Sequence, residues 1–128
     1  MKKRVVKVLV GVLVAGAVLG GIALGVVLWS IHRSVQEYCG VAQQAHPHPG
    51  DDVTALIDYL NSEEHGLRER NHAIWTLQHL ADPAALPSLQ AVYTGELCDH
   101  DKHLCQYELE KAIKRCGGIP NPPRKTGH

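Results

Sequence analysis

The first thirty residues constrain this chain more than any other part of it. A basic start, Met1-Lys2-Lys3-Arg4, runs into an apolar stretch from Val8 to Trp29 that contains no charged residue. About 22 residues of helix rise about 33 Å, which matches a hydrocarbon core of about 30 Å. Residues 1–32 are therefore predicted to be a basic start followed by one transmembrane helix.

The charges around this stretch predict its orientation. Lys2, Lys3, Arg4 and Lys7 all precede it, and the positive-inside rule keeps this end in the cytoplasm. The remainder is then expected to lie outside the cytoplasm of a single-pass cell-membrane protein, in the periplasm if the cell is bacterial. The alternative is a cleaved signal peptide. Its apolar region is usually about 7 to 15 residues long, so the length of this stretch favours a retained anchor.

Small residues form two rows within the predicted span. One row pairs Gly16 with Gly20, and the other contains Ala17, Gly21 and Gly25. Such rows let two membrane helices approach closely, because packing drives helix association in lipid. They are compatible with a homodimer, although glycine is also common in membrane helices in general.

Charge is distributed unevenly along the chain. The sequence has 13 basic and 13 acidic residues, and all 13 acidic residues follow the span, together with nine of the basic ones. Nine minus thirteen gives the part after the span a net charge of −4 with histidine neutral. A nucleic-acid-binding domain needs a basic face, so nucleic acid is not expected as a partner.

Beyond the span, the sequence predicts a stalk and a small all-α domain. Two prolines and a glycine within residues 47–50 prevent a helix from continuing, and residues 33–50 are predicted to be a Pro/Gly-containing stalk. Apolar residues then recur at helical spacing in four segments, which predicts two helical hairpins over residues 51–118. Residues 119–128 are rich in proline and polar residues and are predicted to be a disordered tail.

The two predicted hairpins repeat each other in sequence. Val53, Leu56 and Leu60 of the first hairpin match Leu86, Leu89 and Tyr93 of the second at an offset of 33 residues. A two-helix period of this length is typical of an α-solenoid. The domain is therefore expected to be a small α-solenoid-like structure.

The junction between the hairpins resembles a known repeat. Residues 70–89, RNHAIWTLQHLADPAALPSL, resemble a short bacterial HEAT-type repeat, also found in phycobilisome-lyase-like proteins. Gln78 and Ala81 stand where that repeat usually has glycine. The resemblance implies a scaffold that binds another protein, and it implies no lyase chemistry. The matching residues are Leu80, Asp82, Pro83, Ala85, Leu86, Pro87 and Leu89.

One side of the predicted second helix carries the candidate binding residues. Four of them are spaced at i, i+4, i+7 and i+11, opposite the apolar side. Second helices line the concave surface of HEAT-like stacks, and aromatic and arginine side chains are frequent energetic anchors at interfaces. The alternative is that the tryptophan packs into the small core. The predicted partner-binding residues are Arg68, His72, Trp75 and His79, with Tyr107, Lys111 and Lys114 on the last helix.

Four cysteines follow the span, namely Cys39, Cys98, Cys105 and Cys116. An even number in an oxidising compartment predicts two disulfides. Cys105 and Cys116 lie about 16 Å apart along one predicted helix, which is too far for a bridge. Two connectivities remain: Cys98–Cys105 with Cys39–Cys116, or Cys98–Cys116 with Cys39–Cys105. The first is preferred because Cys98 and Cys105 are close in sequence, and Cys39 could instead bridge two subunits.

The segment from Cys98 to Cys105 also has a rival interpretation. Cys98, His100, His103 and Cys105 could form a metal or redox site, but their spacing is not that of known zinc frameworks. A disulfide is therefore the preferred interpretation, and no cofactor or metal is expected. The sequence also contains no recognisable catalytic arrangement, so a non-enzymatic, protein-binding function is predicted.

Overall fold

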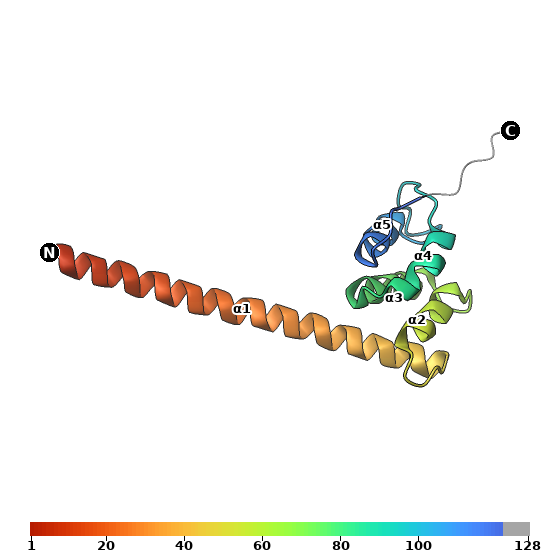
Figure 1. Ribbon diagram of the computed structural model, residues 1–128, viewed down its shortest axis with the longest axis horizontal. Helices are drawn as coiled ribbons and strands as arrows, with labels where there is room; N and C mark the ends of the chain where they lie inside the picture. The colour runs from red at the N-terminus through yellow and green to blue at the C-terminus, as the bar shows by residue number, and fades with distance from the viewer. Residues whose placement is uncertain (122–128) are drawn as a thin grey trace. The chain divides into compact units, whose positions relative to one another are not determined.

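The computed structural model describes residues 1–121, and all of the regular secondary structure there is helical (Figure 1). This confirms an all-α fold over the described residues. Most of the predicted tail, residues 122–128, lies outside them. The chain divides into two units, Met1–Ser34 and a second unit that begins at Val35. The elements are α1 (Lys2–Ala45), α2 (Asp52–Asn61), α3 (Leu67–Leu80), the short 3-10 helix η1 (Pro83–Ala85), α4 (Leu86–Val92) and α5 (Gln106–Arg115).

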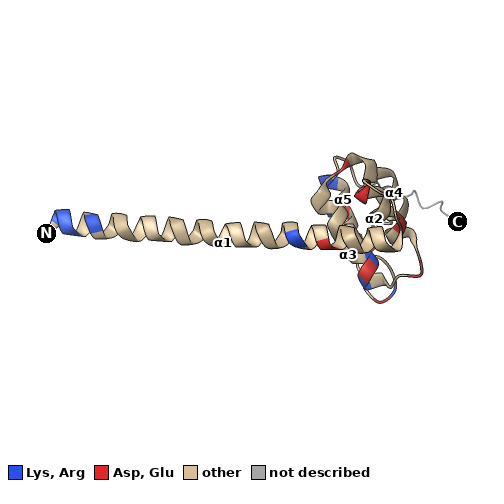
Figure 2. Ribbon diagram, turned by 90° about the horizontal axis from the view of Figure 1, so that it is seen from below, with Lys and Arg blue, Asp and Glu red and all other residues tan. Residues whose placement is uncertain are grey.

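Within the first unit, α1 is an apolar helix with exposed side chains on every side. Its most apolar window has a mean hydropathy of 2.5, and none of that window is buried against other parts of the chain. Lysine and arginine occur at its start and again only beyond the apolar stretch (Figure 2). This helix is long and apolar enough to cross a membrane. Space for a Cβ is open at Gly16, Gly20, Gly21 and Gly25, and the predicted homodimer stays a prediction.

The structure differs from the predicted stalk over residues 33–50. Helix α1 continues without a break to Ala45, and Val35, Cys39 and Ala42 are buried in the second unit. Their spacing of four and three residues places them on one side of the helix. The prolines at 47 and 49 end α1, but they do not affect the turns before it. Most of the segment is therefore a helix of the folded unit.

The helices of the second unit begin and end at residues that stabilise helix termini. Asp51 caps α2 by accepting hydrogen bonds from the backbone N–H (3.0 Å) and the hydroxyl (2.6 Å) of Thr54. These bonds to Thr54 lower the pKa of the Asp51 carboxyl. The carboxylate of Asp82 accepts from the N–H of Ala84 at the start of η1, with Pro83 in the first position.

A glycine pair ends α5. Gly117 has a φ of +90°, a left-handed conformation that side chains disfavour. Its N–H donates to Lys114 O (3.2 Å), and the N–H of Gly118 donates to Ile113 O (2.9 Å). This pair of bonds is a Schellman motif, which satisfies carbonyls that a helix end leaves without partners.

The core of the second unit lies between α2, α3 and α5. Helix α2 packs against α3, α3 packs against α5, and α4 covers part of α5 (Figure 1). Cys116 at the end of α5 is buried in this core, and the burial raises the pKa of its thiol. The large residues that are completely buried include Leu56, Leu60, Ile74, Leu77, Leu89, Leu109 and Ile113.

Candidate functional site

Three of the predicted binding residues form a row of rings on α3. The indole of Trp75 is half-buried between the imidazoles of His72 and His79, with ring centroids 5.4 Å and 4.1 Å away. Nδ1 of His79 donates to the backbone carbonyl of Trp75 at 2.8 Å, which fixes the imidazole. Arg68 is exposed one turn before His72. The indole is thus held in place while part of its surface faces solvent.

Helix α1 covers part of this row, which sequence analysis did not predict. The ring of Tyr38 stacks on His72 with the centroids 4.0 Å apart and the planes 1° from parallel. Its hydroxyl donates to the backbone carbonyl of Glu69 at 2.7 Å. Burial, with smaller effects of Tyr59 and Glu69, raises the pKa of Tyr38, so the hydroxyl stays a donor. Desolvation lowers the pKa of His72, which favours a neutral imidazole in the stack.

The ring contacts continue from Tyr38 towards the end of α1. Tyr38 meets the buried Tyr59 at 5.7 Å, and Tyr59 stacks on His65 at 3.7 Å between centroids. Nε2 of His65 lies 3.1 Å from Nε2 of His46, so one of these nitrogens donates to the other. His46 and His48 lie in the turn that follows α1, and both are partly buried. His48 pairs with the carboxylate of Asp58.

The predicted residues on α5 are occupied by local pairs. The ammonium of Lys111 lies 4.8 Å from the centre of the Tyr107 ring and 2.8 Å from a carboxylate oxygen of Glu108. Lys114 pairs with Glu110 one turn away at 2.5 Å. These bonds to the two glutamates raise the pKa values of both lysines. The α5 residues lie beside the loop of residues 93–105, called the cysteine loop below. The row of His72, Trp75 and His79, called the α3 row below, instead meets Tyr38 of α1.

The cysteine loop meets the start of α5. Sγ of Cys98 lies 2.9 Å from Sγ of Cys105, the residue that precedes the first turn of α5. The backbone N–H of Tyr107 donates to Sγ of Cys98 at 3.2 Å. A ring nitrogen of His100 and the two sulfurs all lie within 4.8 Å of one another. The fourth residue of the rival interpretation, His103, instead donates from Nδ1 to the carbonyl of Leu104 at 3.1 Å.

The other two cysteines occupy separate surroundings. All four cysteines are free thiols in the structure. Cys39 is buried beside Asp52, and the burial together with this carboxylate raises the pKa of its thiol to about 11. Sγ of Cys116 is directed at the backbone carbonyl of Leu77 at 3.9 Å. Of the predicted pairs, the structure brings together Cys98 and Cys105.

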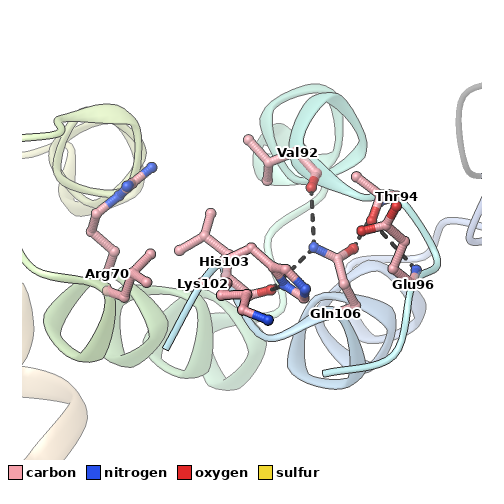
Figure 3. Close-up of a pocket in the computed structure, with 9 residues that line it drawn as sticks. Arg70, Val92, Thr94, Glu96, Lys102, His103 and Gln106 are labelled. Carbon is pink, nitrogen blue, oxygen red and sulfur yellow. Dashed lines mark hydrogen bonds between the residues drawn. The ribbon is translucent and has the colours of Figure 1, made fainter. Parts of the chain in front are cut away.

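Gln106 organises the loop, and the sequence analysis does not single it out. Its side chain is 4% exposed and lies beside a hollow of about 270 Å³ (Figure 3). Its Oε1 accepts from the N–H groups of Thr94 (2.7 Å) and Gly95 (3.4 Å). Its Nε2 donates to the carbonyl of Leu104 at 3.1 Å. One amide therefore joins both ends of the loop to α5. The sequence shows only a polar residue near the start of a predicted helix, which does not reveal that its side chain is buried.

Replacing Gln106 with leucine is expected to lower the free energy of unfolding by about 1 to 3 kcal/mol, because the backbone groups of Thr94, Gly95 and Leu104 lose their hydrogen-bond partner on a buried side chain. Chemical denaturation of the full chain in detergent measures this change. The exposed Gln36 on α1 gives the matched control, and Gln36→Leu is expected to change stability by less than about 0.5 kcal/mol. Equal effects of the two substitutions would show that the amide of Gln106 does not hold the loop.

No family model, curated protein or solved structure matches this chain.

Proposed function

We propose that this chain is a single-span membrane protein with its N-terminus in the cytoplasm, and that its helical unit binds another protein outside the cytoplasm. The observation that carries the binding part is the partly exposed Trp75, held between two imidazoles on α3. The apolar helix supports the anchor, and the basic residues before it support the orientation.

The packing of the second unit supports a HEAT-like arrangement of two hairpins. Helix α2 packs on α3 and α4 packs on α5, as the two helices of each hairpin would. The second helices α3 and α5 pack on each other, and α2 meets η1 at the start of the second hairpin. Contacts between equivalent helices of consecutive hairpins are what a stacked repeat requires. The short α4, only seven residues, makes the second hairpin smaller than the first.

The α3 row has the properties of an interface anchor. Aromatic side chains with little remaining freedom bind at a low entropic cost, and tryptophan and arginine are enriched among the residues that dominate binding. The contacts with His72 and His79 restrict the indole of Trp75 before any partner arrives. The exposed Arg68 adds a positive group one to two turns away. We infer that the partner surface offers an apolar pocket with a carboxylate nearby.

The test is the double substitution Trp75→Ala with Arg68→Ala. Proteins are cross-linked in intact cells, and those captured with the full chain are quantified after detergent extraction. We expect at least a tenfold loss of a specifically captured protein, because truncated anchors typically cost 2 kcal/mol or more. The control is Glu63→Ala with Glu64→Ala, two exposed residues between α2 and α3 that belong to no predicted binding surface. Unchanged capture by the α3 variant, with native circular dichroism, would refute the proposed face.

A further inference from the structure

The two sulfurs of the cysteine loop differ in access. Cys98 is exposed, whereas Cys105 is 3% exposed, and their Sγ atoms lie 2.9 Å apart. A structural disulfide usually has both sulfurs shielded, while an exchangeable one presents a single sulfur to solvent. The asymmetry therefore separates an attacking position from a resolving position. Neither sulfur belongs to the α3 row, so the test of this site does not depend on the proposed partner.

We propose that Cys98 and Cys105 form a reversible dithiol–disulfide couple that exchanges with an external disulfide, with Cys98 as the attacking sulfur and Cys105 as the resolving one. The geometry that carries this is the contact of the two sulfurs at the start of α5, with only Cys98 accessible. The couple adds a redox activity to a unit that is otherwise proposed to bind protein.

The start of α5 presents a backbone hydrogen-bond donor to Cys98. The N–H of Tyr107 is one of the groups that an α-helix leaves without an internal partner, and it donates to Sγ of Cys98. Helix N-termini favour negative charge, and the thiolate is the attacking species in disulfide exchange. Cys105 has the opposite surroundings, since burial and the hydrogen bond that it shares with Cys98 raise the pKa of its thiol. Cys98 thus combines access with a backbone donor, whereas Cys105 is buried, and this assigns the attacking role to Cys98.

The exchange is balanced without a metal or cofactor. The thiolate of Cys98 attacks one sulfur of R–S–S–R′, a bond forms between Cys98 and RS, and R′S⁻ leaves with the electron pair. The thiol of Cys105 then loses its proton to solvent and attacks Sγ of Cys98, which releases RS⁻. The two protein thiols are oxidised to one disulfide, and the external disulfide is reduced to two thiols.

The surface around Cys98 admits a bulky disulfide. A hollow of about 240 Å³ opens beside it, and its lining includes Leu97, Cys98 and Tyr107. Leu97 is 92% exposed and Tyr107 is 61% exposed, which leaves apolar surface next to the accessible sulfur. Glutathione disulfide and a disulfide-bonded polypeptide share the chemistry that this site requires. The two sources are distinguished by testing both as probes.

The experiment uses the reduced full chain in detergent, and intact mass spectrometry follows each reaction. With glutathione disulfide, we expect the unmodified protein to form the Cys98–Cys105 bridge and reduced glutathione to reopen it without denaturant. Cys105→Ser should trap one mixed disulfide at least tenfold faster than Cys98→Ser. The buried Cys39 and Cys116 stay unmodified in both variants and serve as internal controls. Cys105→Ala repeats the comparison if the serine disturbs the fold.

A disulfide-bonded peptide provides the second probe. If this peptide traps Cys98 at least tenfold faster than glutathione disulfide does, the site is assigned to protein substrates. The reverse ratio would assign it to small disulfides. Equal trapping by the two serine variants, or a bridge that resists reduced glutathione until the protein unfolds, would overturn the couple. Stoichiometric zinc that protects both thiols and is lost in His100→Ala would overturn it in favour of a metal site.

Discussion

Two arginines placed within α1, Val14→Arg with Leu19→Arg, are expected to release most of the protein from membranes. The apolar stretch contains 13 valine, leucine and isoleucine residues, which favour insertion by about 4 to 8 kcal/mol in total. Each arginine near the middle of a span costs about 2.5 to 3.5 kcal/mol, so two of them cancel most of that free energy. The measurement is the fraction of protein that stays in the membrane pellet after an alkaline carbonate wash.

The control for this experiment keeps the hydropathy of the helix. Val14→Leu with Leu19→Val exchanges two apolar residues, and it should remain in the pellet as the unmodified protein does. A mature chain that begins near residue 26 would contradict the anchor, because the apolar stretch would then be a cleaved signal peptide. Release of the unmodified protein by carbonate would contradict it as well.

Replacing Leu77 with alanine is expected to lower the free energy of unfolding by about 2 to 5 kcal/mol. Its side chain is 1% exposed on α3, the helix that packs against both α2 and α5. Truncation there leaves a cavity between α3 and the two helices that pack on it. A domain of this size has a small free energy of unfolding, so the loss is a large part of the total. The measurement is denaturant unfolding of the full chain in detergent, monitored by the fluorescence of Trp75 with Trp29 replaced by phenylalanine.

The matched control is Leu97→Ala in the same Trp29→Phe background. Leu97 is 92% exposed, so its truncation removes no buried surface and should change the unfolding free energy by less than about 0.5 kcal/mol. A loss below about 1 kcal/mol for Leu77→Ala would mean that α3 is not at the centre of the core.

Local chemistry made the helices of the second unit predictable. Asp51, Asp82 with Pro83, and Gly117 act on the residues next to them, and each stands at a helix terminus in the structure. The prediction of a stalk over residues 33–50 is wrong for most of that segment, because the prolines at 47 and 49 affect only the residues next to them. Proline restricts its own position and the residue before it, so helix can persist up to Ala45.

The candidate sites depended on contacts between distant residues, which periodicity does not contain. The stack of Tyr38 on His72 joins residues 34 positions apart, and a hydrogen bond from the N–H of Cys105 to the side chain of Asn71 also spans 34 positions. Gln106 resembles any polar residue at a helix start, yet its amide holds both ends of the loop.

The sequence by itself determined an apolar helix of membrane-spanning length, an all-α unit after it and several of the residues at which its shorter helices begin or end. These properties follow from side-chain polarity and short-range backbone geometry, which act over a few residues. Only the tertiary structure decided that α1 continues into the folded unit, that Tyr38 covers part of the α3 row, and that Cys98 is accessible while Cys105 is buried. Those properties depend on which surfaces pack together, and packing is a balance of many long-range contacts.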